Sequence, residues 1–363
     1  MLYLVKEVEK LKNNNIEKIL IIRLSALGDA IHTLPLANAL RKRYPNIQID
    51  WIVEDKAEKF ILNNPLLNNV YVLERKKWKK MNFYNVLKEF FLIIKKIRSE
   101  KYDIVIDTQQ LLKSSIIMEL SRGKRKIALD GGREFSWLFA NEIIKTNRKQ
   151  FDINYHVVKR NLEIAQYLDC NDIKPDFVIP DLSKEYSKDI IDIIQNIDKS
   201  RKTILIAPAT TWKNKHWKVE GWVELINEFK EYCNIIITAT EKEKILTNKI
   251  LEKVSGKNII NLTGMTTIAD IVYICKNVDL VISPDSGSAH IAWATAHPQI
   301  ITLFFATSAN RTAPYGDKYY SIQSNSLCSP CMKKHCRLKA NKNKCVEEIS
   351  SEKRINIVKK VLQ

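Results

Sequence analysis

The chain has 363 residues, 45% hydrophobic and 28% charged, so it can bury a large core and is longer than one average domain. Its 59 Lys and Arg outnumber 41 Asp and Glu, and the formal net charge of +18 favours an anionic partner through long-range attraction. The longest stretch without Asp, Glu, Lys or Arg, 286–310, is broken by Gly, His and Pro, which argues against a transmembrane helix. The first residues lack the long apolar segment of a secretion signal, so we expect a cytoplasmic protein.

Short β-branched runs alternate with longer amphipathic stretches along the first half, a pattern typical of a parallel sheet covered by helices. The runs predict strands at 18–23, 48–53, 70–73 and 103–107. The amphipathic stretches between and after them predict helices at 30–43, 84–98, 114–122 and 155–168. We therefore expect an α/β domain over 18–172, preceded by an N-terminal extension over 1–17.

Prolines after Asn171 interrupt this pattern and predict a linker. The alternation then resumes with strands at 203–207, 234–238, 258–261, 279–282 and 300–304. The helices predicted between them cover 219–231, 241–254, 268–276 and 288–295. We expect a second α/β domain over 173–345 and a C-terminal helix over 346–363, with ligands bound outside the carboxyl ends of the strands.

The loop after the first strand holds the first candidate site. Gly28 permits a tight turn there, and Asp29 stands where a helix begins. Its carboxylate can either cap the free amides of that helix or project into the ligand site. None of the nine glycines falls in a G-x-G-x-x-G or Walker A pattern, which argues against dehydrogenases and P-loop kinases.

Two strand-to-helix loops of the second domain carry groups that bind anions. The loop at 207–217 offers the hydroxyls of Thr210 and Thr211 and the charge of Lys215, which suit a diphosphate, although a solvated polar loop is the alternative. The loop that begins at Asp285 enters a helix directly, so its amides would form an anion nest. It lacks the G-x-S-x-G of a serine hydrolase, which argues against hydrolysis.

Two further clusters have more than one interpretation. Residues 75–80 place five cations around one Trp, either as a solvated face or as a site for an anionic acceptor. Near the end of the chain the cysteines are spaced C-x₂-C-x₄-C-x₈-C. This spacing suits a structural Zn²⁺ site, but reduced thiols and an oxidisable pair are alternatives. The four residues are Cys328, Cys331, Cys336 and Cys345.

Together these segments resemble the ADP-heptose:lipopolysaccharide heptosyltransferases of glycosyltransferase family 9, most closely the heptosyltransferase I branch. The resemblance implies a GT-B fold of two Rossmann-like domains facing across a cleft, with the C-terminal helix packing back on the first domain. It also implies catalysis without a metal or cofactor and ADP-heptose bound in the second domain. The donor-binding residues implied are Thr210, Thr211, Lys215, Glu241, Met265, Asp285, Ser286, Gly287 and His290.

The acceptor implied is Kdo-lipid A at the inner face of the cytoplasmic membrane, to which the positive charge would draw a peripheral, monomeric protein. Inverting transfer needs a carboxylate as general base, and Asp29 is the candidate. The sequence leaves open whether Arg23 orients Asp29 or holds the acceptor. The acceptor-binding cations are Arg23, Lys76, Lys77, Lys79, Lys80, Lys113 and Arg133.

Two other functions are compatible with features of the sequence. The cysteine-rich tail is more similar to heptosyltransferase II relatives, so a transferase that adds a later core sugar is the first alternative. The second is a nucleic-acid-binding protein, suggested by the sequence pI of about 9.4 and the basic run. The chain lacks a recognisable reading helix or RNP aromatic pattern, so we expect no nucleic-acid partner.

Overall fold

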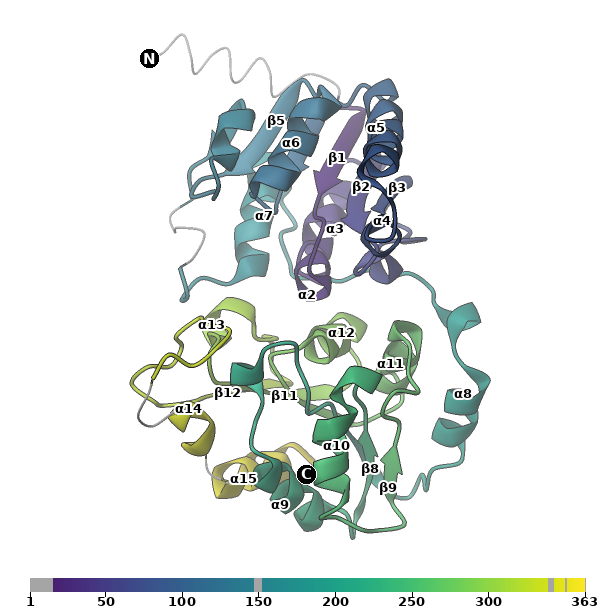
Figure 1. Cartoon of the computed structure of the whole chain (residues 1–363), viewed down its shortest axis with the longest axis vertical. Helices are drawn as coiled ribbons and strands as arrows, with labels where there is room; N and C mark the ends of the chain where they lie inside the picture. Colours follow the sequence, from purple (N-terminus) through teal and green to yellow (C-terminus); the bar gives the residue numbers. More distant parts are fainter. Residues whose placement is uncertain (1–15, 147–151, 339–342, 350, 363) are drawn as a thin grey trace. The chain divides into compact units, whose positions relative to one another are not determined.

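The computed structural model describes residues 16–146, 152–338, 343–349 and 351–362, which form two α/β units that divide after Pro180 (Figure 1). Each unit contains one six-stranded sheet in which every neighbouring pair of strands is parallel. The predicted α/β class is therefore confirmed. Except for residues 16 and 17, the expected N-terminal extension, 1–17, lies outside the described residues.

The sheet of unit 1 has the strand order β3-β2-β1-β4-β5-β6. Its strands are β1 (Lys18–Ile22), β2 (Gln48–Glu54), β3 (Asn69–Leu73), β4 (Ile104–Asp107), β5 (Arg125–Leu129) and β6 (Glu142–Ile144). The helices are α2 (Leu27–Ile31), α3 (Leu34–Arg43), α4 (Arg75–Trp78), α5 (Phe83–Ser99), α6 (Leu112–Ser121) and α7 (Val157–Tyr167), with short 3₁₀ turns η1 (Glu58–Phe60) and η2 (Ser136–Phe139). Helix α3 contacts α7, and α5 contacts α6, as expected for right-handed crossovers on the two faces of the sheet.

Three features of unit 1 differ from the sequence prediction. The helix expected over 30–43 is two helices, and Pro35, which lacks an amide hydrogen, lies in the first turn of the second one, where that hydrogen would have no partner within the helix. Strands β5 and β6 were not predicted, since β5 opens on two charged residues and β6 has only three residues. The unit extends past the predicted boundary at 172, because Lys42 pairs with Asp172 and Asp176, each at 2.9 Å.

The sheet of unit 2 has the strand order β12-β11-β10-β7-β8-β9. Its strands are β7 (Lys202–Ile206), β8 (Cys233–Ile237), β9 (Ile259–Asn261), β10 (Leu280–Pro284), β11 (Gln299–Phe304) and β12 (Tyr319–Gln323). The helices are α8 (Lys188–Gln195), α9 (Val219–Phe229), α10 (Lys244–Leu251), α11 (Ile268–Cys275), α12 (Gly287–Thr295), α13 (Ala309–Thr312), α14 (Lys344–Glu347) and α15 (Ser351–Leu362), with 3₁₀ turns η3 (Ser183–Glu185), η4 (Lys213–Lys215) and η5 (Glu241–Glu243). Strand β12, which extends the edge of the sheet, was not predicted.

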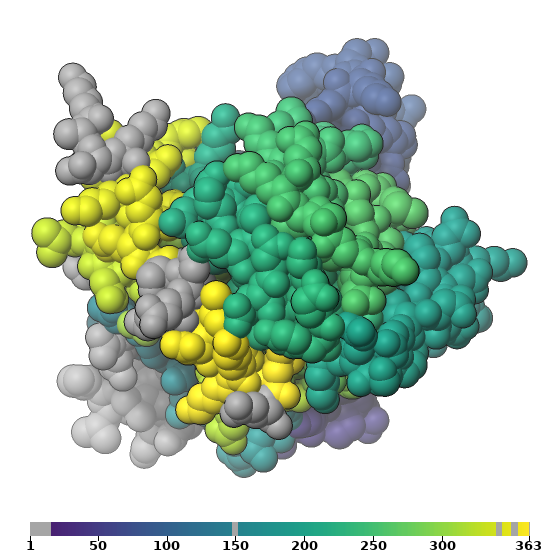
Figure 2. Space-filling model, turned by 90° about the horizontal axis from the view of Figure 1, so that it is seen from below, coloured from purple at the N-terminus to yellow at the C-terminus, as the bar shows by residue number. Residues whose placement is uncertain are grey.

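The C-terminal helix α15 packs within unit 2. It contacts α9, and its Val358 and Val361 belong to the apolar core of this unit. The Lys359 ammonium lies 2.5 Å from the Glu228 carboxylate on α9. In the space-filling view of Figure 2, the yellow surface of the C-terminal residues borders the green surface of unit 2. These contacts correct the expectation that this helix packs back on the first domain, because its apolar side chains are buried against unit 2.

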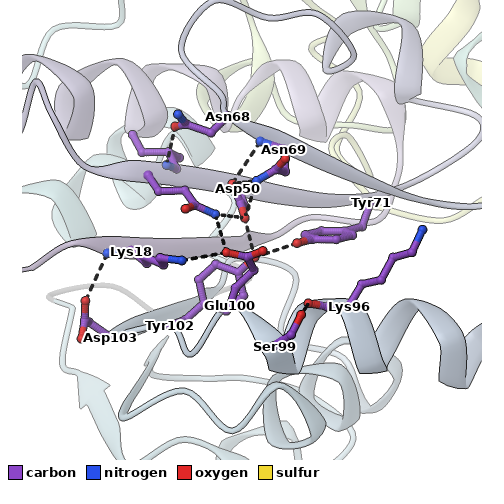
Figure 3. Close-up of polar contacts among 12 residues, drawn as sticks. Lys18, Asp50, Asn68, Asn69, Tyr71, Lys96, Ser99, Glu100, Tyr102 and Asp103 are labelled. Carbon is purple, nitrogen blue, oxygen red and sulfur yellow. Dashed lines mark hydrogen bonds and ion pairs between the residues drawn. The ribbon is translucent and has the colours of Figure 1, made fainter.

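A buried carboxylate joins the amino ends of the strands in unit 1 (Figure 3). Asp50 on β2 is fully buried, and its Oδ2 accepts hydrogen bonds from the Tyr102 hydroxyl at 2.5 Å and the Gln48 amide at 2.8 Å. Its Oδ1 accepts from the backbone amide of Asn69 at 3.0 Å. Burial raises the pKa of the neighbouring Tyr71 to about 12, so both phenols remain donors at neutral pH. Both oxygens of Asp50 are thus satisfied by hydrogen bonds.

Candidate active site

In each sheet the strand order reverses between two neighbouring strands, and open α/β sheets bind ligands outside the carboxyl ends of strands at such a point. In unit 1 the reversal lies between β1 and β4, and in unit 2 between β7 and β10. Arg23 directly follows β1, and Asp285 directly follows β10. The predicted site residues therefore begin at the two positions that the topology favours.

An ion pair in unit 1 links the two strands of its reversal. The Nη2 atom of Arg23 lies 2.9 Å from Oδ1 of Asp29, and Nη1 donates to the Thr108 carbonyl, beyond β4, at 2.6 Å. The other Asp29 oxygen accepts from the Ala26 amide at 3.2 Å. Asp29 thus caps α2 and also presents a carboxylate whose side chain is 41% exposed. The capping interpretation of Asp29 is therefore confirmed, and its projection into a ligand site stays a prediction.

Asp107 fixes the loop that follows β4 next to this ion pair. It was not among the site residues predicted from the sequence. Its buried carboxylate accepts from the amides of Gln109 and Gln110 and from the hydroxyls of Ser114 and Ser115. Burial raises the pKa of Asp107 above its usual range, against the opposing effect of these hydrogen bonds. The side-chain Oε1 of Gln109 in turn accepts from the Leu24 backbone amide at 2.8 Å. A carboxylate at a strand end followed by paired serines was the available sequence signal.

The predicted acceptor cations do not share one environment. Lys113 at the start of α6 pairs with Glu54 at 2.8 Å, and Lys77 pairs with Glu89 at 2.6 Å. Of the other predicted cations, Arg23 is buried, and four have exposed side chains: Lys76, Lys79, Lys80 and Arg133. The charges of Lys113 and Lys77 are therefore partly neutralised within unit 1.

The Trp78 ring is not exposed among the cations of residues 75–80. Its side chain is buried in the core of unit 1, and its indole Nε1 donates to Glu89 at 2.6 Å. Because the Trp78 indole and the Lys77 ammonium both bind the Glu89 carboxylate, Trp78 anchors α4 to α5. The five cations of residues 75–80 remain exposed around it.

Unit 2 contains a buried charge cluster at its strand reversal. Lys215 Nζ lies 2.6 Å from Oδ2 of Asp285 and donates to the Asp285 carbonyl at 3.1 Å. His290 Nε2 lies 3.3 Å from Oδ1 of the same carboxylate, which is only 5% exposed. Burial acts to raise the pKa of Asp285, but the His290 hydrogen bond and the Lys215 charge outweigh it and hold this pKa below its usual range.

The loop that carries Lys215 is folded onto this cluster. The Thr210 hydroxyl donates to the Asp285 carbonyl at 3.4 Å, and the His216 ring contacts the Thr210 carbonyl at 2.6 Å. The Lys215 ammonium also stacks 4.9 Å from the centre of the half-buried Trp212 ring. The neighbouring Thr211 side chain is exposed. The structure thus brings Thr210 and Lys215 together with Asp285, although they are separated by about 70 residues in the chain.

The other two tryptophans near this loop are core residues. Trp217 and Trp222 are buried with ring centres 4.9 Å apart. Gly221 packs so closely on the Trp217 ring that a Cβ atom there would lie 2.1 Å from it. The two tryptophans therefore support the loop from the core of unit 2, and their burial keeps them away from any ligand-binding surface.

The start of α12 is the second predicted anion-binding element. Ser286 caps this helix, and its hydroxyl is 2.7 Å from that of Ser283 and accepts from the Ala289 amide at 3.5 Å. The next residue, Gly287, is exposed, so the positive end of the helix faces solvent beside Asp285. The predicted residues Ser286, Gly287 and His290 therefore adjoin the charge cluster.

Glu241 and Met265 lie at the ends of the neighbouring strands β8 and β9. Gly264 has a φ of +78°, and a Cβ atom there would meet Oε2 of Glu241 at 2.2 Å. Both Glu241 and Met265 are exposed, and Glu241 pairs with Lys244 at 3.2 Å. The structure therefore brings these two predicted donor contacts next to each other.

Comparison with known proteins agrees with this arrangement. Residues 90–342 match the model of glycosyltransferase family 9 (heptosyltransferase).

The chain belongs to this family.

The family 9 chain is similar to the lipopolysaccharide heptosyltransferase 1 of Campylobacter coli, with 30% identity over 311 residues, 82% of this chain and 86% of that protein. It is also similar to the lipopolysaccharide core heptosyltransferase OpsX of Haemophilus influenzae, with 29% identity over 303 residues, 82% of this chain and 81% of OpsX. The solved structure of the E. coli heptosyltransferase WaaC with ADP-2-deoxy-2-fluoro heptose aligns with a TM-score of 0.68 and 22% identity, over 94% of this chain and 99% of that one. The GT-B fold and the family resemblance are confirmed.

The described residues contain no group of three His, Cys, Asp or Glu side chains arranged to hold a metal ion. Among the described residues, none of the four clustered cysteines forms a disulfide; Cys345 is buried and the other three are half-buried. Burial, with the neighbouring thiols, raises the pKa of Cys345 to about 11. The structural zinc site at these cysteines stays a prediction. Within the same described part of the chain, no helix is both long and apolar enough to cross a membrane.

The depressed pKa of Asp285 predicts a pH-dependent stability of unit 2. The carboxylate stabilises the fold fully above its unfolded pKa of about 3.9 and loses this contribution as pH falls toward the folded value. Asp285→Asn should therefore lower the free energy of unfolding at neutral pH by about 3 kcal/mol, because Lys215 is left unpaired, and flatten its pH dependence below about pH 4. Denaturant unfolding across this range measures both effects.

Glu228→Gln is the matched control, because it removes the more exposed ion pair with Lys359 and should cost under about 1 kcal/mol. If the free energy of unfolding changes with pH by the same amount in Asp285→Asn and in the wild type, protonation of Asp285 is not coupled to unfolding.

Proposed function

We propose that the protein transfers L-glycero-D-manno-heptose from ADP-heptose to a Kdo hydroxyl of Kdo-lipid A, with inversion at the anomeric carbon. The observation that carries this proposal is the buried cluster of Lys215, Asp285 and His290 beside the positive end of α12 in a family 9 chain. The names of the similar proteins, lipopolysaccharide heptosyltransferase 1 and core heptosyltransferase OpsX, support this choice of donor and acceptor class.

The donor is held by groups of unit 2. An ammonium has three N–H groups, and Asp285 accepts two from Lys215, which leaves one for a diphosphate oxygen. Thr210, Thr211 and the amides at the start of α12 supply further donors, with Ser286, Gly287 and His290 beside the heptose and its phosphate. In this proposal Glu241 accepts from the ribose hydroxyls, and Met265 contacts the adenine.

The acceptor is activated by Asp29. A sugar hydroxyl has a pKa far above 7, so it must lose its proton to a carboxylate as it attacks the anomeric carbon on the face opposite the leaving diphosphate. The ion pair between Arg23 and Asp29 supports an orienting role for Arg23, since it fixes one oxygen and leaves part of the carboxylate exposed. The exposed cations Lys76, Lys79, Lys80 and Arg133, with the paired Lys77 and Lys113, suit the anionic groups of Kdo-lipid A.

The departing ADP gathers negative charge as the glycosidic bond breaks. Lys215 and the α12 amides are fixed before the reaction and stabilise this charge, so we propose that no catalytic metal or other cofactor is required. We further propose a monomer that works in the cytoplasm at the inner face of the membrane, where a lipid-linked acceptor is exposed.

The direct test is ADP release from ADP-L-glycero-D-manno-heptose with and without Kdo-lipid A, in the presence of a chelator, with the product mass recorded. Acceptor-dependent release and the added mass of one heptose support the proposal. Release only with an already heptosylated core would assign the chain to the transferases that add a later sugar.

Asp29→Asn should reduce transfer by roughly two orders of magnitude or more, because the amide cannot accept the proton. Its carbonyl oxygen can still accept from the Ala26 amide, so the variant separates the base from the cap, and Asp29→Ala removes both. ADP affinity should stay within a few-fold in both variants, as measured by calorimetry. Near-normal turnover of Asp29→Asn would leave Asp29 with its capping role alone.

Lys215→Ala should weaken ADP binding and slow transfer together, with a combined loss of about 2–4 kcal/mol in kcat/KM. Lys213→Ala in the same 3₁₀ turn is the control, because this exposed lysine has no contact with Asp285 among the described interactions. Titration with ADP and steady-state kinetics measure both steps. An ADP affinity unchanged in Lys215→Ala would refute the diphosphate assignment.

A further inference from the structure

Exposed apolar side chains gather on one face of unit 1. Of the seventeen large apolar side chains exposed among the described residues, ten lie in α5, α6 or η2, counting the residue that caps η2. Helix α6 contacts both α5 and η2, so the three elements form a continuous surface, and Figure 1 shows α5 and α6 on the same face of the sheet. We call this surface the α5–η2 face. Apolar clusters of this kind mark interaction sites.

Helix α5 is apolar on two sides. Ile94 and Ile97 are buried in the core, as expected for a helix that covers a sheet. Phe83, Tyr84 and Phe91 are instead 77%, 74% and 54% exposed, so the core does not account for them. A helix that packs only on its own sheet needs one apolar side. The second apolar side of α5 therefore indicates a surface that contacts another molecule.

The short turn η2 presents three more large apolar side chains. Phe135 and Leu138 are 66% and 70% exposed, and Trp137 is 40% exposed. The Phe135 and Trp137 rings lie 5.4 Å apart, and Phe135 has a φ of +59°, which is unusual for a bulky residue. The backbone thus holds an aromatic pair at the surface of the protein.

The charge around the α5–η2 face is strongly positive. Residues 75–99 contain nine Lys or Arg and one Glu, a net +8 of the chain's +18. Lys88, Lys95 and Lys96 are exposed on α5 among the apolar side chains. Apolar side chains that include aromatic rings, surrounded by lysines, are typical of helices that lie in the headgroup region of anionic bilayers.

We propose that the α5–η2 face docks on an anionic lipid bilayer, with its apolar side chains inserted at the boundary of headgroups and acyl chains. This inference rests on the proposed function insofar as a lipid-linked acceptor gives the docking a purpose. A second copy of the chain fits this face poorly, because a self-interface would bring two strongly cationic segments together. An anionic lipid surface matches both the apolar and the charged side chains.

The position of the face in unit 1 agrees with this partner. The first turns of α5 and α6 and the turn η2 all follow the carboxyl ends of strands, β3, β4 and β5 respectively. Arg23 and Asp29 lie at the same edge of the sheet, after β1. Docking through this face would therefore place the edge that holds the candidate base close to the lipid headgroups.

The test is flotation of the full chain with acceptor-free vesicles, made either of phosphatidylcholine alone or of phosphatidylcholine with phosphatidylglycerol. The wild type should bind the anionic vesicles and bind the neutral ones more weakly. The double variant Phe91→Ser with Leu138→Ser should lower partitioning on the order of tenfold, because two exposed apolar groups no longer insert. Lys88→Glu with Lys95→Glu should remove the preference for phosphatidylglycerol.

The matched control is Tyr232→Ser with Ile245→Ser, which removes two side chains of unit 2 that are 52% and 74% exposed and should leave vesicle binding unchanged. Thermal unfolding reports on folding in every variant, because ADP affinity would report on unit 2 alone. Wild-type binding by the Phe91/Leu138 variant, or no binding by the wild type, overturns the proposal. A dimer that becomes a monomer in the Phe91/Leu138 variant, with vesicle binding unchanged, assigns the face to a second copy and also overturns it.

The vesicles contain no acceptor, so this result does not depend on transfer. Loss of transfer with vesicle binding retained would refute the proposed function alone. Transfer to a soluble, deacylated acceptor without vesicle binding would refute the docking alone.

Discussion

A carboxylate can be buried at the end of a strand only if cations and donors are fixed around it, and Asp285 imposes this constraint on unit 2. Lys215 comes from the loop after β7, and His290 from the first turns of α12. Both must keep their positions for the carboxylate to stay charged. The same requirement fixes donors in advance of a reaction, which is how a site lowers the barrier for a leaving group that gains charge.

Unit 1 meets a related constraint with a less buried pair. Arg23 is 8% exposed and bridges the ends of β1 and β4 through Thr108, while its partner Asp29 remains partly open to solvent. The buried Asp107 holds the neighbouring loop by accepting four hydrogen bonds. A rigid cation beside an accessible carboxylate is suited to proton transfer, because the carboxylate is oriented without being enclosed.

The strands of both sheets were largely predictable, because buried parallel strands are short β-branched runs such as 19–22 and 280–282. The pairing of Lys215 with Asp285 was not predicted, since no local pattern joins residues so far apart in the chain. The roles of Trp78, Trp217 and Trp222 could not be predicted, because an indole in a polar loop has the same sequence signature whether it packs inward or lines a site. The C-terminal helix was misplaced for a similar reason, since its apolar stripe does not specify which unit covers it.

The two ends of the sheet in unit 1 hold their polar groups for different purposes. At the amino ends of the strands, Asp50 and Tyr102 form a closed network in which every carboxylate oxygen is already bonded. At the carboxyl ends, Asp29 and the exposed cations belong to loops and helix starts. The hydrogen bonds that stabilise the sheet and the candidate functional residues therefore lie at opposite ends of the strands. Residues in the loops at the carboxyl edge can therefore be replaced without disturbing the polar network that secures the fold at the opposite edge.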